Sequence, residues 1–338
     1  MDWQLQPALP SFEKSHAQWD RLNNDRGGHI LLDSRFLDCL LRHFGQRDVF
    51  LGIREGAPGG MALVWRKSPA VWETFQPSQA PLGLIVTGKG GDTEDAVQSL
   101  IQSLPGYALQ VSLLHLDPDY QPFSVTNDHG RADRLDYIRT ARISLEGTFE
   151  EYWRLREGRL RKNNDRLRRR MAEKGLRLEF VIVSEPAEIA EAIREYGRLE
   201  AKGWKAQEGT AVAADNVQGR FYRDLLESFC ASGEGAVYQL RIDGKVVASD
   251  ICLFRDDTII LLKTSYDEEW SVYSPAFLLR EDVVRHLYAE GVVKRYEFYG
   301  PLMDYQLRWT NEVRTLHHLT YYRHSWVRTL KRIVTRFV

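Results

Sequence analysis

Three strand-like segments joined by two tight turns constrain the fold of this chain more than any other feature. They run consecutively from residue 235 to residue 267 and read GAVYQLRIDG, KVVASDICLFRD and TIILLKTSYD. The joints IDGK and RDDT carry the Gly and Asp residues that two-residue hairpin turns favour. The sequence therefore predicts a three-stranded antiparallel meander.

A helix is predicted directly after this meander. The segment SPAFLLREDVVRHLYAEG begins at Ser274, carries Pro275 in its first turn and ends at Gly291, as helix boundaries commonly do. The strand KRYEFYG (294–300), the short helix DYQLRWTNE (304–312) and the strand TLHHLTYYR (315–323) follow. This order predicts an α/β (α+β) fold, in which helices flank a mixed, mostly antiparallel sheet.

The first part of the chain predicts a separate set of strands and helices. The segment DSRFLDCLLRHFG predicts a helix from Asp33 to Gly45, and DVFLGIRE, GGMALVWRK and YALQVSLLHL are strand-like. Residues 124–136 are polar and rich in turn formers, which favours a boundary there. A length of 338 residues also favours two domains. The predicted division is 1–138, 139–323 and a basic C-terminal tail, 324–338.

The most basic stretch is predicted to form one helix from Thr148 to Gly175. Between Arg154 and Arg170 it carries nine Lys or Arg residues and two acids. One narrow stripe of the helix is apolar except for an asparagine; it consists of Trp153, Leu160, Asn164, Leu167 and Met171. Two interpretations stay open: a solvated face, or a local site for the phosphates of a cofactor or acceptor, which arginine binds bidentately.

The overall charge argues against a general binder of nucleic acids. Lys and Arg number 46 and Asp and Glu 47, whereas polyanion binders usually carry a basic excess, so no DNA partner is predicted. The three cysteines are far apart in apolar runs, which indicates reduced thiols and a cytoplasmic location. No secretory signal or membrane span is predicted. The nine histidines lack metal-ligand spacing, so no metal is predicted.

Four further stretches carry a resemblance to a known family. They read RLEAKGWKAQEGTA, IDGKVVASDICLF, SPAFLLREDVVRHL and EFYGPLMDYQLRWT. Together with the order of elements, they resemble the FemAB-like, cellulose-biosynthesis-type acetyltransferases of the GNAT superfamily. The resemblance covers about residues 20–323. It implies two GNAT-like domains in tandem, of which the first is degenerate.

The resemblance implies acetyl-CoA or another acyl-CoA as the cosubstrate. In GNAT enzymes the acyl-CoA enters between the fourth and fifth strands, here 258–266 and 294–300. Its pyrophosphate lies at the N-terminus of the helix between them, where backbone N–H groups and the helix dipole favour an anion. The cofactor-binding residues implied here are Ser265, Tyr273, Ser274, Ala276, Phe277 and Leu278.

The chain departs from the family pattern at two places. The segment WSVYSPAF has neither glycine of the usual pyrophosphate loop, and Ala276 stands where relatives often have glycine. Gln306 follows Tyr305 where relatives tend to have lysine.

Acyl transfer to an amine needs a base for the ammonium proton and an acid for the leaving thiolate. Glu297 is the candidate base, because alternation along its strand puts it on the same face as Tyr299 and opposite the apolar face. Tyr305 is the candidate acid, because the resemblance implies a tyrosine acid at the start of this helix. Tyr266, at the end of the fourth strand, is a second candidate acid or a contact for the acceptor.

Other residues are candidates for binding the acceptor. Asp250 interrupts an apolar run, and a buried carboxylate there must either meet an arginine or line the site. The candidate acceptor-binding residues are Trp204, Lys205, Asp250 and Tyr299.

The resemblance implies an N-acyltransferase that moves an acyl group from acyl-CoA to an amine on a sugar, lipid precursor or peptide, in envelope or exopolysaccharide metabolism. Two alternatives stay open. One is a Fem-type transferase that uses aminoacyl-tRNA, in which case the basic helix would contact tRNA. The other is a GNAT-like binding module without catalytic activity.

The C-terminal segment SWVRTLKRIVTRFV has no acidic residue. Four apolar residues fall on one face if the segment is helical: Trp326, Leu330, Ile333 and Phe337. This pattern indicates either a helix docked on the protein or peripheral contact with an anionic membrane surface.

Overall fold

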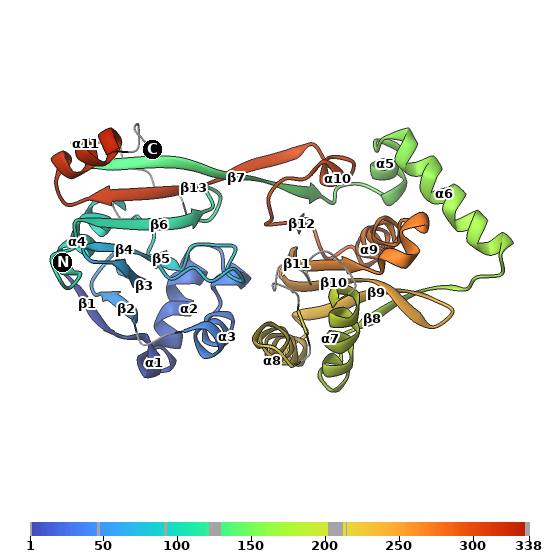
Figure 1. The fold of residues 1–338 in the computed structure, drawn as a ribbon, viewed down its shortest axis with the longest axis horizontal. Helices are drawn as coiled ribbons and strands as arrows, with labels where there is room; N and C mark the ends of the chain where they lie inside the picture. Colours follow the sequence, from blue (N-terminus) through green and yellow to red (C-terminus); the bar gives the residue numbers. More distant parts are fainter. Residues whose placement is uncertain are drawn as a thin grey trace. The chain divides into compact units, whose positions relative to one another are not determined.

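The computed structural model describes residues 2–45, 48–90, 93–121, 130–201, 212–213 and 215–334. The chain divides into two compact units: unit 1 combines residues 1–139 with 315–338, and unit 2 consists of residues 140–314 (Figure 1). Strands β7 (Ala132–Ser144) and β13 (Glu312–Tyr322) each contribute residues to both units. The domain limits 1–138, 139–323 and 324–338 stay predictions.

Unit 1 contains a mixed, mostly antiparallel sheet. Its strands follow the order β1-β2-β3-β4-β6-β13, with β5 paired to β3, and the pair of β4 and β6 is parallel. The strands that lie wholly in this unit are β1 (Trp3–Pro7), β2 (Val49–Arg54), β3 (Gly60–Ser68), β4 (Val71–Thr74), β5 (Ile85–Thr87) and β6 (Gln110–Leu116).

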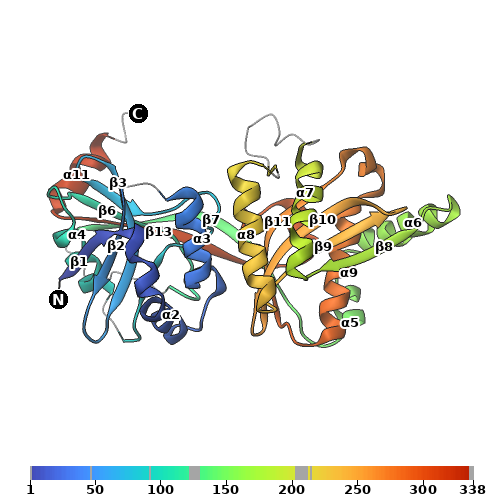
Figure 2. The same ribbon diagram turned by 90° about the horizontal axis from the view of Figure 1, so that it is seen from below.

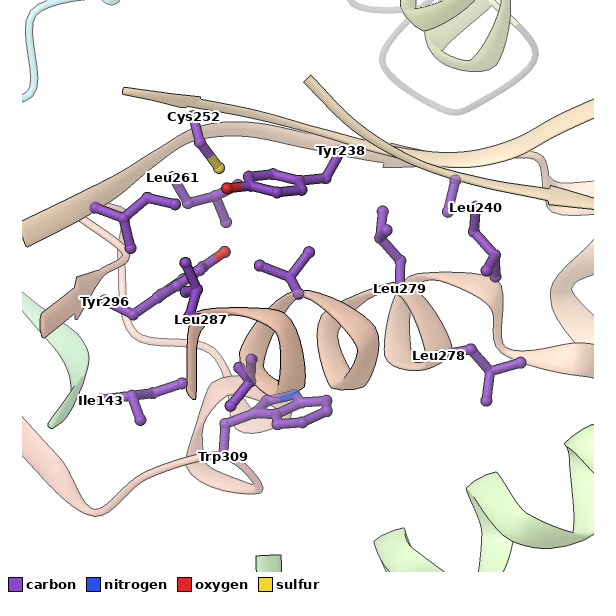
Figure 3. Close-up of a cluster of buried hydrophobic side chains, with 14 of the residues drawn as sticks. Ile143, Tyr238, Leu240, Cys252, Leu261, Leu278, Leu279, Leu287, Tyr296 and Trp309 are labelled. Carbon is purple, nitrogen blue, oxygen red and sulfur yellow. The ribbon is translucent and has the colours of Figure 1, made fainter. Parts of the chain in front are cut away.

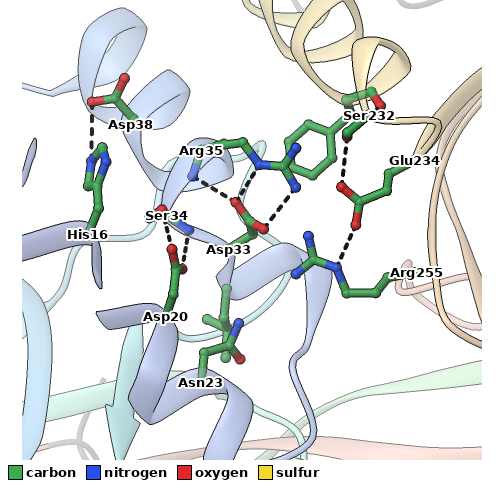
Figure 4. Close-up of polar contacts among 12 residues, drawn as sticks. His16, Asp20, Asn23, Asp33, Ser34, Arg35, Asp38, Ser232, Glu234 and Arg255 are labelled. Carbon is green, nitrogen blue, oxygen red and sulfur yellow. Dashed lines mark hydrogen bonds and ion pairs between the residues drawn. The ribbon is translucent and has the colours of Figure 1, made fainter. Parts of the chain in front are cut away.

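Helices flank this sheet. They are α1 (Ala8–Ser11), α2 (His16–Asp25), α3 (Ser34–Phe44), α4 (Thr93–Ser103) and α11 (Ser325–Val334), with 3-10 turns η1 (Glu13–Ser15) and η2 (Ile30–Leu32). The predicted helix from Asp33 to Gly45 is confirmed by α3. Asp33 caps this helix by accepting from the Arg35 N–H group, and Ser34 donates to Asp20 (Figure 4).

Unit 2 contains the remaining strands of the 13-stranded sheet, in the order β7-β12-β11-β10-β9-β8. The strands β9 (Gly235–Ile242), β10 (Lys245–Arg255) and β11 (Thr258–Tyr266) confirm the predicted meander. Asp243 and Gly244 have φ values of 50° and 79°, as a two-residue hairpin turn with this twist requires. At the open end of the β9–β10 hairpin, the Glu234 carboxylate accepts hydrogen bonds from the Ser232 hydroxyl and the Arg255 guanidinium (Figure 4). The remaining strands are β8 (Leu178–Val183) and β12 (Arg295–Glu297).

Helices cover both faces of the strands of unit 2. Helices α7 (Pro186–Ala201) and α8 (Val217–Ala231) lie on one face, and α9 (Pro275–Glu290) lies on the other with α5 (Phe149–Arg154) and α6 (Gly158–Glu173) (Figures 1 and 2). The turn η4 (Glu268–Tyr273) precedes α9, and α10 (Asp304–Leu307) precedes β13.

The two units repeat one arrangement of strands and a helix. In unit 1 the hairpin β3–β4 is followed by α4 and then by β6, which pairs parallel to β4. In unit 2 the hairpin β10–β11 is followed by α9 and then by β12, which pairs parallel to β11. The predicted fold class, a tandem of mixed and mostly antiparallel sheets flanked by helices, is therefore confirmed.

The prediction of a single basic helix is wrong. Residues Phe149–Arg154 form α5 and Gly158–Glu173 form α6, with a break between them. The break has a tertiary cause, because the Tyr152 hydroxyl and the Arg156 guanidinium both donate to the carbonyl oxygen of Trp309. These two bonds turn the chain at the end of α5.

The core of unit 2 lies between its sheet and α9. In Figure 3, Tyr238, Cys252 and Leu261 extend from the strands towards α9, and Leu279 and Leu287 extend from α9 towards the strands. All five are buried. The three cysteines of the chain are buried with free thiols. None of the described helices is long and apolar enough to cross a membrane.

Candidate functional site

The parallel pairing of β11 with β12 is short. It joins Thr258–Ile260 to Arg295–Glu297, although β11 continues to Tyr266. After Glu297 the chain keeps only its other neighbour, β7, since the Phe298 N–H donates to the carbonyl oxygen of Ala141 at 3.2 Å. Beyond Ile260, β11 therefore has no further residue pairs with β12. The resemblance implies that the acyl group enters at this point, where the pairing of the two strands ends.

Helix α9 begins between these two strands in the chain, at Ser274. Ser274 adopts a left-handed conformation with φ of 48°, and Pro275 is the first helical residue. The N–H groups of Phe277 and Leu278 donate to the Ser274 carbonyl at 3.0 and 3.3 Å. Two of the three N–H groups predicted to face a pyrophosphate are therefore used inside the helix, and Ala276 carries the third.

Cationic side chains surround the start of α9. The Lys174 ammonium donates to the Tyr273 hydroxyl at 3.1 Å, and the Arg170 guanidinium lies 5.7 Å from the centre of the same ring. The Arg308 guanidinium lies 5.4 Å from the ring of Phe277. Positive charge is thus gathered beside Tyr273 and Phe277, two predicted cofactor-binding residues.

The basic helix α6 packs against α9 through its buried stripe. Asn164, which interrupts that stripe, is fully buried and donates to Glu281 at 2.9 Å. Arg168 donates to Asp282 at 2.6 Å. The other face of α6 is exposed to solvent and includes Arg159, Lys162, Arg166, Arg169 and Arg170. One side of α6 therefore holds the helix to α9. The other side is either a solvated face or a local site for phosphates, as the sequence allowed.

Asp250 and Arg280 form a buried ion pair between β10 and α9. Their charged atoms are 3.0 Å apart, and the side chains are 1% and 4% exposed. The same guanidinium contacts the Tyr296 hydroxyl and lies 5.3 Å from the ring of Phe298. Burial raises the pKa of Asp250, and the charge of Arg280 opposes that shift. Asp250 therefore pairs with an arginine, which is the first of the two alternatives predicted for it.

Tyr305, in the first turn of α10, is partly buried and within electrostatic range of this ion pair. Burial raises the pKa of its hydroxyl, Arg280 lowers it and Asp250 raises it. The structure thus brings together two predicted residues, Asp250 and Tyr305. Sequence reasoning missed Arg280, although its spacing from Val283 and Leu287 puts it on the apolar stripe of α9.

Glu297 lies on the face of β12 that points away from α9. Its neighbour Tyr296 belongs to the core against α9, and successive side chains of a strand point to opposite faces. The Glu297 carboxylate is fully buried, 2.7 Å from the Arg314 guanidinium and 3.9 Å from that of Arg142. Arg314 also lies 5.0 Å from the ring of Tyr299. Glu297 and Tyr299 therefore come together as predicted, and the two arginines were missed.

The remaining predicted residues take peripheral positions. Ser265 and Tyr266 end β11, opposite Ser249 and Ala248 of β10, and Tyr266 is exposed. The predicted acceptor-binding residues Trp204 and Lys205 lie outside the described residues. Among the residues that are described, no group of three or more His, Cys, Asp or Glu side chains is placed to hold a metal ion.

Comparisons with known proteins found one matching family model and several solved structures with a similar fold. Residues 158–307 match a family model described as an acetyltransferase (GNAT) domain. The crystal structure of FemX is similar, with a TM-score of 0.59 and 9% identity over 93% of this chain and 98% of that chain. So is the C-terminal domain (DUF2156) of a candidate lysylphosphatidylglycerol synthetase from Agrobacterium fabrum, with a TM-score of 0.58 and 14% identity over 95% and 97% of the two chains.

A third similar structure is L-PGS from Bacillus licheniformis, with a TM-score of 0.53 and 12% identity over 95% of this chain and 96% of that chain. A search of curated proteins found no match. At these identities, the solved structures show a shared fold.

Proposed function

We propose that this chain is an N-acyltransferase that moves an acyl group from acyl-CoA to an amine, because residues 158–307 match the acetyltransferase (GNAT) domain model and the fold is similar to that of FemX. The observation that carries the proposal is the short parallel pairing of β11 with β12, which ends at Ile260 and Glu297. The thioester would lie where this pairing ends. The pyrophosphate would lie near Ala276, with Arg170, Lys174 and Arg308 supplying positive charge.

The proposed reaction uses two side chains beside β12. The amine nitrogen attacks the thioester carbonyl carbon, the C–N bond forms, and the C–S bond breaks. Glu297 accepts the proton that the amine loses, and Tyr305 donates a proton to the departing thiolate. The charges of Asp250 and Arg280 act in opposite directions on the pKa of Tyr305, so the pair would tune this acid. Tyr299 and the exposed Tyr266 are left to contact the acceptor, together with Trp204 and Lys205.

The acceptor is proposed to be an amine on a sugar, a lipid precursor or a peptide, in the synthesis of the envelope or of an exopolysaccharide. The similarity to FemX and to lysylphosphatidylglycerol synthetase domains supports an acceptor of this range, since it shows the same fold in proteins with those names.

Thermal unfolding with acetyl-CoA at millimolar concentration tests the donor. The melting temperature of the wild type is expected to rise, and Ala276→Asp is expected to remove the rise because its carboxylate repels the pyrophosphate. Ala289→Asp, at the exposed far end of the same helix, is the matched control and should keep the rise. No rise with any acyl-CoA in the wild type would end the acyl-CoA proposal, and a rise without release of free thiol would favour a binding module.

A Fem-type transferase that uses aminoacyl-tRNA is the second candidate. Two observations favour it: the exposed cationic face of α6, and the use of the Phe277 and Leu278 N–H groups within α9. Binding of charged tRNA should then fall steeply with salt concentration. Replacing Arg166, Arg169 and Arg170 with Gln should make that slope shallower by about one for each lost phosphate contact. A salt-independent signal, or none, would remove this candidate.

A further inference from the structure

Charged side chains attach helix α11 to the rest of unit 1. Arg328 pairs with Asp133 at 2.9 Å, and Arg332 contacts the same carboxylate. Lys331 donates to the Gln110 side chain at 2.8 Å. A helix docked on a soluble domain normally turns its apolar stripe inward and its charges outward, so this attachment is the reverse of the usual one.

The apolar stripe of α11 is left exposed as a result. Trp326, Leu330 and Ile333, spaced by four and three residues, are 58%, 55% and 50% exposed. They are therefore neighbours on one face of the helix. Contiguous exposed apolar side chains with a polar rim mark surfaces that contact a membrane or another protein.

Aromatic residues with polar groups extend this surface. Tyr107 is 63% exposed, and its hydroxyl lies 3.0 Å from the His324 ring nitrogen Nε2. The His324 ring in turn stacks on Trp326, with a centroid distance of 6.0 Å. Tyrosine and tryptophan are enriched where a membrane meets water, because each ring is apolar and carries a polar group.

The positive charge beside the apolar stripe of α11 indicates which kind of surface the stripe can bind. The segment Ser325–Val334 contains three cations, Arg328, Lys331 and Arg332, and no acid. Asp133 is the acid that pairs with two of them, so the rim of the stripe keeps an excess of positive charge. An apolar stripe bordered by cations is complementary to a layer of anionic headgroups over acyl chains.

We propose that α11 lies in the interface of an anionic phospholipid membrane. Trp326, Leu330 and Ile333 enter the boundary between headgroups and acyl chains, and Lys331 and Arg332, which are bonded to unit 1, add positive charge that attracts the anionic headgroups. The ion pairs to Asp133 hold the helix so that its apolar stripe faces outward. This proposal goes beyond acyl transfer and does not depend on it, since its test measures partition and not turnover.

Sedimentation with phosphatidylcholine vesicles, with and without phosphatidylglycerol, tests the proposal. The full chain is expected to partition onto the vesicles that contain phosphatidylglycerol, and less so as salt concentration rises. Leu330→Glu/Ile333→Glu is expected to lower the partition coefficient at least about tenfold, since it removes two apolar side chains and adds two negative charges. Lys331→Gln/Arg332→Gln is expected to lower it roughly fivefold for each charge removed.

The matched control makes the same double change on an exposed part of unit 2. Leu155 and Val292 are 78% and 63% exposed, so Leu155→Glu/Val292→Glu should leave partition and melting temperature unchanged. Wild-type partition that is absent, or equal on neutral and anionic vesicles, would overturn the proposal. So would light scattering that shows a dimer in the wild type which Leu330→Glu/Ile333→Glu dissociates, because a second copy would then cover the stripe. If that variant does not fold, the salt dependence of the wild type and the partition of Lys331→Gln/Arg332→Gln decide the matter.

Discussion

Glu297 combines complete burial with two arginine neighbours. Its carboxylate lies 2.7 Å from Arg314 and 3.9 Å from Arg142. A buried carboxylate of this kind has two separable functions: it neutralises a buried arginine, and it offers a site for a proton. Removal of one partner of a buried pair leaves the other charge uncompensated. Measurements of stability and of turnover therefore answer different questions about this residue.

We expect Glu297→Gln to lower turnover by about 10²–10⁴, because the amide keeps the shape of the side chain but does not accept the proton. We also expect it to lower the free energy of unfolding by about 3–5 kcal/mol, measured by urea denaturation, as for a broken buried pair. Arg314→Gln serves as the control, with a similar loss of stability and a much smaller loss of turnover per folded molecule. Equal turnover losses in the two variants would make Glu297 a structural residue only.

The pH dependence of turnover tests Tyr305 as the acid. An acid acts in its protonated form, so activity is present below its pKa and is lost above it. Burial raises the pKa of Tyr305 above its ordinary value of 10.0. The kcat profile should therefore show no descending limb below pH 10.0, and Tyr305→Phe should lower kcat less than Glu297→Gln, since water protonates a thiolate readily. A descending limb near neutral pH that persists in Tyr305→Phe would assign the acid to another group.

The sequence indicated single site residues better than their partners. Asp250 stood out because a carboxylate interrupts an apolar run, and it is indeed buried. Its partner Arg280 did not stand out, because an arginine on a long helix is usually exposed and only its position on the apolar stripe marked it. Arg142 and Arg314 were also missed, since their contact with Glu297 depends on which strands are neighbours, and this is not a local property.

At the scale of elements, the contact between α6 and α9 explains half of the basic stretch. Asn164 bonds Glu281, and Arg168 bonds Asp282. Burial raises the pKa of Asp282, and Arg168 opposes that shift. The charges on this side of α6 therefore join two helices, and they are not available to a ligand.

This contact predicts a difference between two adjacent arginines. Arg168→Gln should lower the free energy of unfolding by about 1–2 kcal/mol, because it removes a charged hydrogen bond to a half-buried carboxylate. Arg169→Gln should change it by no more than about 0.5 kcal/mol, since this side chain is exposed. Chemical denaturation of both variants measures the difference. Equal effects would show that Arg168 does not hold α6 to α9.

Elements with strong local signals were predictable, and their interruptions were not. The meander and α9 have hairpin residues, an N-terminal proline and a C-terminal glycine, which act through local backbone preferences. The break between α5 and α6 has only a weak local signal, Gly158, at the first residue of α6, because one glycine inside a helical pattern is tolerated. Its cause is a bond to Trp309, which is far away in the sequence. The end of β12 was not predictable either, because it is followed by Tyr299 with a φ of 47°, a conformation that tyrosine rarely adopts.

At the scale of the molecule, unit 1 is built from both ends of the chain. Its sheet includes β13, which pairs with β6 from His317↔Leu116 to Tyr322↔Gln110. Leu319 and Tyr321 of this strand are buried in the same core as Val111 and Leu113. The alternation of TLHHLTYYR predicted a strand, but nothing local in it indicated β6 as the neighbour.

Two truncated chains test this arrangement. A chain that ends at Arg314 should be poorly soluble or should melt at a much lower temperature, because it lacks the strand that covers the edge of β6. A chain that ends at His324 keeps β13 and loses α11, so it should stay soluble, with a melting temperature close to that of the full chain. Solubility and thermal unfolding compare the two. If both chains behave alike, β13 is dispensable for unit 1.

The division of unit 1 between residues 1–139 and 315–338 also has a consequence for synthesis on the ribosome. Translation delivers unit 2, residues 140–314, as one uninterrupted segment. The first segment of unit 1, although made earlier, has to wait for β13. During that wait β6 has one strand neighbour, β4, and an unpaired edge, which is the kind of edge that recruits other chains. The half that is made first is therefore completed last, and until then its β6 edge can pair with other chains.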